Sequence, residues 1–320
     1  MAVPTRRWFC ANADVARPDG FELHADVCAT LLASERARGR DAVVTVDVGR
    51  AHHAPYRGEL VEWILDVCAG ERYGPTTADV AIAYTDQVLS KTVVPKTSLH
   101  LVALCCLQIA VKYEEIEERM PTMAKLRAWT SNMYSSDIIQ KMELAVLVEL
   151  KWELGVITPA HFLESFLAMT CNGTTAEDEV DVGVWTPRYR EDLRQLVCQL
   201  YSLCVHDIEL TNKPPSRVAA AVIATARLNL GLKPLCPPAL RTVANVVPQQ
   251  IYPIVMRIHR MWEEACADDE TMDYVEEEPK NFNSLAINVP EVNAHLYADE
   301  KQRLTENASP VSPFDMHWDE

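Results

Sequence analysis

Two charged residues border long apolar stretches and are the first candidates for chemistry in this sequence. Lys112 ends the apolar run 99–111, at the helix end whose dipole favours an ammonium group. Glu143 lies between Met142 and Leu144, ahead of another strongly apolar run. A lysine offers only hydrogen-bond donors and a carboxylate only acceptors, so together they can satisfy backbone groups of both kinds on a partner. The plainer alternatives are a lysine that extends from a helix end into solvent and a glutamate on a solvated face.

The sequence lacks the signatures of an enzyme or a metal protein. It contains no nucleophile elbow, HExxH motif, P-loop or Gly-rich phosphate loop, and its nine histidines are scattered. The ten cysteines include no CxxC, and they occur within apolar stretches, singly or as the adjacent pair Cys105 and Cys106. This usage is typical of buried free thiols in a reducing compartment. We therefore expect no catalytic residue, no metal site and no cofactor.

Composition indicates the class of fold and of partner. Nearly half of the 320 residues are hydrophobic and only 10 are glycine, which favours packed helices over a β-sandwich or a Gly-rich phosphate-binding fold. The formal net charge is −16, so phosphate backbones and anionic lipids are poor partners. No apolar run is long enough to cross a membrane, and the first residues lack the apolar stretch of a signal peptide. We expect a soluble, intracellular protein that binds neither nucleic acid nor membrane.

The elements that must position Lys112 and Glu143 are helices arranged in two similar halves. Apolar residues recur every three or four positions from Pro55 onward, and Gly and Pro residues separate the runs. Thr76 and Thr77 are candidate caps of the second helix in this series. Each half has a central helix of small and aliphatic residues, SLHLVALCCLQIAV and SRVAAAVIATARL. Small side chains let neighbouring helices approach closely, as the middle helix of a five-helix bundle requires.

We predict an all-α protein with four parts along the chain. An amphipathic helix at about 20–36 and a charged linker form the N-terminal segment, and two five-helix domains of about 100 residues follow. The last part is an acidic tail without a helical period, which we expect to be disordered. The predicted boundaries are 1–53, 54–157, 158–266 and 267–320.

Residues 56–264 resemble a cyclin box followed by a second cyclin fold. The cyclin pattern has an Arg early in its first helix, an Asp late in the second, a Leu early in the third, a Lys at the end of the third and a Glu early in the fifth. The matching residues are Arg57, Asp86, Leu101, Lys112 and Glu143. The stretch SLHLVALCCLQIAVKYEE, with MPTMAKL and MELAVLVELKWEL after it, looks closest to cyclin J and next to the D-type cyclins. The resemblance implies two tandem five-helix cyclin folds.

The same resemblance implies a regulatory subunit that catalyses nothing itself. Cyclins bind and activate cyclin-dependent serine/threonine kinases, and this likeness implies a role in cell-cycle control in the nucleus or the cytoplasm. Lys112 and Glu143 match the cyclin residues that hydrogen-bond backbone groups beside the kinase's mobile PSTAIRE-type helix. Anchoring that helix inward brings its Glu onto the ATP-binding Lys of the kinase.

Five neighbouring residues complete the kinase-binding set that the resemblance implies. Tyr113, Leu147 and Leu154 match apolar cyclin positions that pack against the kinase helix, although leucines at such positions are often ordinary core residues. Glu114 and Glu115 could meet a basic activation segment. The alternative for these two is a solvated acidic turn shared with Glu117 and Glu118.

Two further sets of residues take other roles in the resemblance. Arg57 and Asp86 match an internal ion pair that joins the first two helices, which is a structural role. In cyclins that recruit RxL-type substrate or inhibitor peptides, the first helix presents an exposed apolar groove. Glu59 places a carboxylate where that groove has an aliphatic contact, which is unfavourable unless it pairs with a basic residue, so we expect an altered peptide specificity. The alternative is an ordinary amphipathic helix with Trp63 in the core. The matching positions are Tyr56, Glu59, Leu60, Trp63, Asp66 and His100.

Ser309 and Ser312 each precede a proline in the tail, which makes them candidate sites for proline-directed kinases. One alternative to kinase activation also stays open at this point. A cyclin fold can serve as an interaction scaffold that binds another protein, or that binds a kinase without activating it. The zinc ribbon and the basic surface of transcription-factor relatives are both missing here, and the presence of Lys112 together with Glu143 favours kinase binding.

Overall fold

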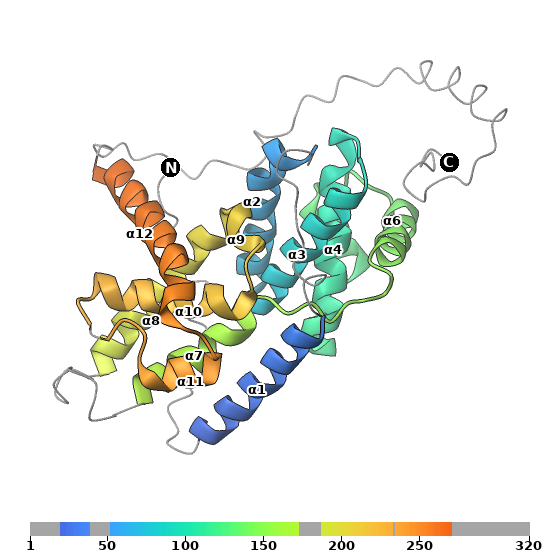
Figure 1. Ribbon diagram of the computed structural model, residues 1–320. Coiled ribbons are helices and arrows are strands. Elements are labelled where there is room, and N and C mark those ends of the chain that lie inside the picture. The colour runs from blue at the N-terminus through green and yellow to red at the C-terminus, as the bar shows by residue number, and fades with distance from the viewer. Residues whose placement is uncertain (1–19, 39–51, 173–186, 233, 271–320) are drawn as a thin grey trace.

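The structure, a computed structural model, describes residues 20–38, 52–172, 187–232 and 234–270. These residues form helices and no strand, which confirms the predicted all-α class. A first helical unit comprises α2 to α6, a second comprises α7 to α12, and α1 (Gly20–Arg38) precedes both (Figure 1). Across these ranges, no helix is long and apolar enough to cross a membrane.

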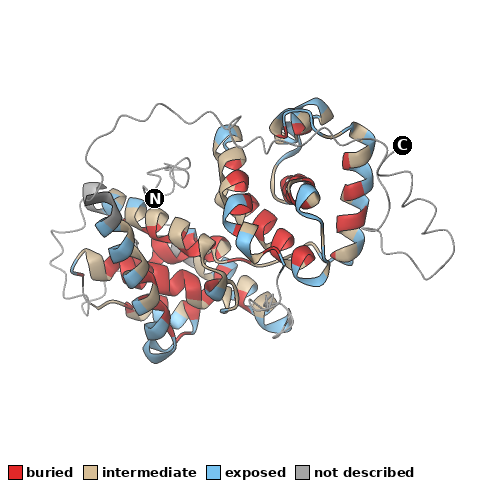
Figure 2. Ribbon diagram, turned by 90° about the horizontal axis from the view of Figure 1, so that it is seen from above, coloured by how far each residue is buried: buried red, intermediate tan, exposed pale blue. Residues whose placement is uncertain are grey.

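The first unit is built around α4, whose residues from Leu101 to Val111 are all buried. Helices α2, α3 and α6 pack on it, and small side chains such as Ala103 and Ala110 permit that close approach. Buried residues accordingly gather on the inward faces of the helices (Figure 2). The helices are α2 (Ala54–Glu71), α3 (Pro75–Lys91), α4 (Leu99–Glu114), α5 (Met123–Trp129) and α6 (Ser136–Glu149), with short 3-10 turns at Lys96–Ser98 and Glu117–Arg119.

The second unit repeats this plan around α10, which is buried from Val218 to Arg227. Helices α7, α8 and α12 pack on α10, and its run of alanines gives them room. The two central helices are therefore the small-residue stretches that the sequence marked. The helices of this unit are α7 (Ala160–Asn172), α8 (Pro187–His206), α9 (Ile208–Thr211), α10 (Pro215–Asn229), α11 (Pro238–Ala244) and α12 (Pro248–Glu270).

Helix α1 packs on the second unit, against α7 and α11, although the first unit follows it in sequence (Figure 1). His24 Nδ1 lies 3.1 Å from Ser165 Oγ on α7. Glu35 accepts hydrogen bonds from the backbone N–H of Ser216, at 3.0 Å, and from its hydroxyl, at 2.8 Å. Ser216 lies in the first turn of α10, whose N–H groups have no partner within the helix. A carboxylate from α1 therefore caps the central helix of the second unit.

Two local predictions need correction. Thr76 and Thr77 do not cap α3, because the helix begins at Pro75 with Gly74 as its N-cap and with no side-chain cap. Proline suits this first helical position because its φ is already fixed near the helical value. Helix α12 continues to Glu270, past the predicted start of the tail at 267. The rest of the tail, 271–320, lies outside the described residues.

Candidate functional site

Lys112 and Glu143 meet at the surface between the end of α4 and the middle of α6. Lys112 Nζ donates to Glu143 Oε1 at 2.5 Å. The lysine side chain is 46% exposed and the glutamate side chain 15% exposed, so the pair is accessible and Glu143 is the more enclosed of the two. The structure thus places both candidate residues together on one face, where a partner can reach their remaining donors and acceptors.

A ladder of side-chain contacts sets the register of α4 against α6 below this pair. Cys105 Sγ donates to the carbonyl of Ile139 at 3.6 Å. One turn further along, Gln108 Nε2 donates to Glu143 Oε2 at 3.0 Å, and Lys112 is one turn further again. Residues spaced by three and four lie on the same helix face. The sequence analysis did not single out Gln108, and its only sequence signal is a polar residue in an otherwise apolar run.

Apolar side chains are exposed on α4 and α6 and in the turns that follow these two helices. Tyr113 is 52% exposed next to Lys112, as its predicted role in a partner contact requires. Leu147 and Leu154 are only partly buried and pack against the core, so each keeps some exposed surface. Sequence reasoning missed five further exposed residues, which are Ile116, Met120, Leu144, Val148 and Trp152. We call these five residues, with Tyr113, the apolar rim.

The apolar rim has a sequence signal that is visible once α6 is known to be a helix. Ile139, Met142 and Val146 already form its buried face. Leu144 and Val148 are one turn apart on a different face, and both are exposed. A surface helix needs one apolar stripe to join a core, so a second stripe indicates a surface for a partner.

Trp152 is held outward by an unusual backbone. Lys151 and Trp152 have φ values of 54° and 60°, in the left-handed region that non-glycine residues rarely adopt. Their N–H groups bond back to the carbonyls of Val148 and Leu147 at 3.0 Å, which terminates α6. The indole remains 62% exposed. A large apolar side chain that is kept exposed on a strained turn is typical of a functional site.

The two glutamates that follow Tyr113 are engaged within the chain. Glu115 accepts hydrogen bonds from the Gly74 N–H and the Thr77 hydroxyl, both at 2.7 Å, and it pairs with Arg119 at 2.5 Å. This corrects the expectation that Glu115 meets a basic activation segment, because its carboxylate is buried and occupied. Glu114 is half-buried, and its Oε1 lies 3.7 Å from His161 Nε2 at the start of α7. Glu117 and Glu118 are exposed, as the acidic-turn alternative expected.

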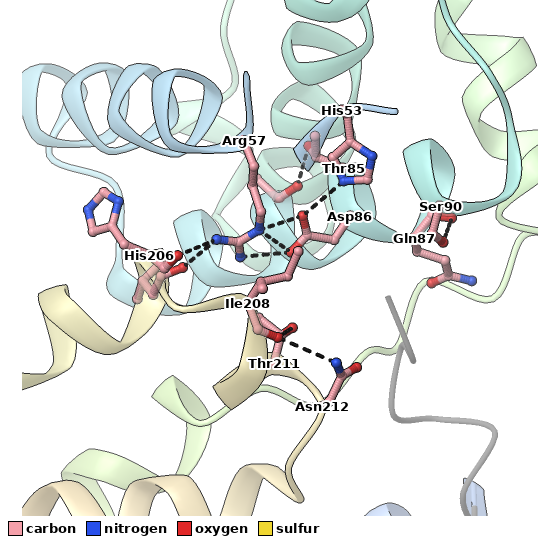
Figure 3. A network of polar contacts seen from close by, with 12 residues as sticks. His53, Arg57, Thr85, Asp86, Gln87, Ser90, His206, Ile208, Thr211 and Asn212 are labelled. Carbon is pink, nitrogen blue, oxygen red and sulfur yellow. Dashed lines mark hydrogen bonds and ion pairs between the residues drawn. The ribbon is translucent and has the colours of Figure 1, made fainter. Parts of the chain in front are cut away.

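Arg57 and Asp86 form the internal ion pair that the resemblance implied, and the pair reaches further than α2 and α3. The guanidinium holds both carboxylate oxygens, with Nε–Oδ1 at 2.9 Å and Nη2–Oδ2 at 2.8 Å. Its Nη1 also donates to the carbonyls of Val205 and His206 at the end of α8, at 3.1 and 2.9 Å (Figure 3). One arginine therefore ties the two units together.

The electrostatics of this ion pair favour an ionised Asp86. Burial alone would raise the pKa of the Asp86 carboxyl, but the charge and hydrogen bonds of Arg57, with a contribution from His53, hold that pKa below its ordinary value. His53 Nε2 lies 3.8 Å from Asp86 Oδ1. Both members of the Arg57–Asp86 pair are buried, which gives the pair the structural role that the sequence analysis assigned to it.

The predicted peptide-docking set includes two apolar residues that are buried in the structure. Leu60 and Trp63 belong to the core, and the Trp63 ring packs edge-on against His100 at 6.1 Å. Burial lowers the pKa of His100, although the neighbouring Glu59 carboxylate opposes this shift. Glu59 is exposed and Asp66 is half-buried. The remaining member, Tyr56, carries the ammonium of Lys96 over its ring at 4.4 Å.

Other predicted features concern thiols, metals and phosphorylation. Eight cysteines whose side chains the structure describes are free, and six of them are buried. Within the part of the chain that the structure describes, no three His, Cys, Asp or Glu side chains gather as they would to bind a metal ion. Ser309 and Ser312 lie outside the described residues.

The chain matches two family models that together span both helical units. Residues 26–155 match the cyclin N-terminal domain and residues 157–283 match the cyclin C-terminal domain. Among solved structures, the chain is similar to a viral cyclin from herpesvirus saimiri, with a TM-score of 0.55 and 16% identity over 75% of this chain and 97% of that one. This likeness supports the fold alone.

Known proteins with similar sequences include D-type cyclins. It is 64% identical to Cyclin-D of Ostreococcus tauri over 95% of this chain and 81% of that protein. It is 28% identical to G1/S-specific cyclin-D1 of Bos taurus over 68% of each chain, and 32% identical to that of Xenopus laevis over 54% of this chain and 55% of that protein. These matches confirm the D-type likeness and do not support the predicted rank of cyclin J above it. Two tandem cyclin domains, an all-α fold and a D-type relative of high identity together show that the chain belongs to the cyclin family.

Proposed function

We propose that this chain binds and activates a cyclin-dependent serine/threonine kinase in cell-cycle control, as a regulatory subunit without an activity of its own. The name of the relatives, G1/S-specific cyclin-D1, supports the cell-cycle role. The observation that carries the proposal is the accessible Lys112–Glu143 pair, with an exposed Tyr113 next to Lys112 and an exposed Trp152 in the turn after α6. Polar groups that fix orientation, next to apolar groups that bury area, are the composition of a protein-binding site.

The geometry of Lys112 and Glu143 is suited to hold the mobile PSTAIRE-type helix of the kinase by hydrogen bonds. Lys112 Nζ has three donors and uses one on Glu143, so it has donors left for a backbone carbonyl of the kinase. Glu143 has further lone pairs for a backbone N–H. The apolar rim offers side chains for the non-polar face of the same kinase helix. Holding that helix inward completes the Lys–Glu ion pair of the kinase active site, and this is how binding raises activity.

Docking of RxL-type peptides is not part of this proposal. An apolar peptide side chain needs an open pocket, and Leu60 and Trp63 are buried in the first unit. Glu59 is also exposed on the same helix, and an apolar peptide side chain packed over its carboxylate would be unfavourable.

The test is a pull-down with the full chain and two variants, Lys112→Glu and Glu143→Ala. We expect the wild-type chain to retain a kinase that phosphorylates a standard substrate, and both variants to lose at least about tenfold in retained kinase and activity, because each leaves a buried polar group of the partner unpaired. Lys91→Glu, at the exposed end of α3, is the matched control and should behave as wild type. Full retention of active kinase by both variants would refute the site, and retention of an inactive kinase by the wild type would indicate a scaffold.

A further inference from the structure

Gln108 is a polar residue inside the most apolar helix of the chain. It is 4% exposed, one turn before Lys112 on α4. Its Nε2 donates to Glu143 Oε2 at 3.0 Å, whereas Lys112 holds the other oxygen of the same carboxylate. The Glu143 carboxylate therefore accepts from two side chains, the buried neutral amide of Gln108 and the exposed ammonium of Lys112.

The orientation of the Gln108 amide follows from its partner. With the amide turned over, its oxygen would face a carboxylate oxygen, which is repulsive, so the NH₂ group must point at Glu143. The Oε1 of Gln108 is then left buried without a hydrogen-bond partner among the described residues. Such an unpaired acceptor destabilises the folded chain, and a leucine at this position would avoid that cost.

Core packing alone therefore does not explain the glutamine, whereas its hydrogen bond to the Glu143 carboxylate does. Exposure rises in steps along this chain of contacts, from 4% for Gln108 to 15% for the Glu143 side chain and 46% for that of Lys112. The exposed lysine is the member that can leave to bind a partner. The buried glutamine is the member that cannot move, because the packed core fixes its rotamer.

We propose that Gln108 is a positioning residue for kinase binding, one that keeps the Glu143 carboxylate aimed at the partner when Lys112 turns to the kinase. This inference rests on the proposed function. Lys112 already holds one oxygen of Glu143. Without Gln108, the second oxygen would also be free to turn to the ammonium, and the kinase would have to open this tighter ion pair before it binds. With Gln108, one oxygen is fixed from inside, and the other oxygen and the ammonium are free to exchange partners at little cost.

The test compares Gln108→Leu with the wild-type chain for affinity and for stability. The probe is a panel of recombinant cyclin-dependent kinases from Ostreococcus tauri, the source of the 64% identical relative. We expect the variant to bind the cognate kinase about tenfold more weakly, the size of one charge-assisted hydrogen bond, while its thermal midpoint stays equal or rises. A purely structural role would lower affinity and midpoint together. If Gln108→Leu does not fold, Gln108→Met gives the same comparison with a more adaptable side chain.

A matched control and a double variant make the result specific. Gln195 makes the same type of contact, Nε2 to Glu191 Oε1 at 3.1 Å, on the exposed surface of α8, so Gln195→Leu should leave affinity unchanged. In a Glu143→Ala background, Gln108→Leu should cause no further loss, because the residue acts through Glu143. Wild-type affinity of Gln108→Leu, or an equal loss in both backgrounds, would overturn the inference while the proposed function stands. Normal binding by Glu143→Ala alone would remove the premise of this inference, whereas a wild-type chain that retains no active kinase would overturn the proposed function itself.

Discussion

The Glu143 carboxylate is the centre of the proposed site, because Lys112 donates to one of its oxygens and Gln108 to the other. The cyclin-like pattern placed Lys112 and Glu143 in order, and the structure brings them to 2.5 Å. The pattern could not show that Gln108 donates to the second oxygen of Glu143, or that the Glu115 carboxylate accepts hydrogen bonds from Gly74 and Thr77. Those outcomes depend on helix register and on side-chain rotamers, which a list of residue types does not contain.

The exposed Trp152 is a candidate anchor for the kinase. Its indole is 62% exposed, so Trp152→Ala removes little core packing and should change the free energy of unfolding by less than about 0.5 kcal/mol. If the indole anchors a partner, the same change should weaken kinase binding at least about tenfold, because buried tryptophans dominate interface energies. Isothermal titration calorimetry and thermal unfolding of one preparation measure both quantities.

The control for Trp152 is Tyr252, an aromatic residue of similar exposure on α12 of the second unit. Tyr252→Ala should leave kinase affinity unchanged. Equal losses from the two variants would mean that exposed aromatic residues stabilise the complex non-specifically. That result would count against the α4–α6 face, the surface formed by Lys112, Glu143 and the apolar rim, as the kinase-binding site.

At the scale of elements, periodicity predicted the helices well and their ends less well. The central helices α4 and α10 followed from runs of small apolar residues, because only a helix buried on every side has such a composition. The start of α3 was wrong because Pro75 rather than a threonine opens the helix. The link from α2 to the end of α8 could not be predicted, since Arg57 donates there to backbone carbonyls, which every residue type has.

The Arg57–Asp86 tie predicts a specific dependence of stability on pH. The pKa of Asp86 is lowered in the folded chain. As the pH falls below the ordinary aspartate pKa of about 3.9, Asp86 is therefore protonated in the unfolded chain before it is protonated in the folded chain. The stabilisation is therefore complete above about pH 4–5 and is lost as the pH falls through the lower folded pKa. Asp86→Asn should cost about 3 kcal/mol at pH 7, because it leaves a buried guanidinium unpaired, and this difference should shrink in acid.

Urea unfolding of the wild type and Asp86→Asn between pH 7 and pH 3 measures this dependence. Asp192→Asn, an exposed aspartate on α8, is the control and should follow the wild type throughout. A constant difference between wild type and Asp86→Asn across the whole range would contradict the assignment of an ionised Asp86.

The whole molecule acts as a frame that holds the α4–α6 face in place. Arg57 and the Glu114–His161 contact join the first unit to the second, and α1 braces the second unit through Glu35. The sequence predicted two similar domains and the amphipathic helix α1. It could not predict that α1 docks on the second unit, because an apolar stripe does not specify which surface will cover it.

Hydrogen–deuterium exchange on the full chain, with and without the kinase, tests the central claim most directly. If the kinase sits on the face formed by Lys112, Glu143 and the apolar rim, bound kinase should slow exchange in the turns that flank it, at 115–121 and 150–156. The second unit, from α8 to α12, should exchange at the same rate in both samples. Unchanged exchange in these two turns, with protection confined to α8–α12, would contradict the account.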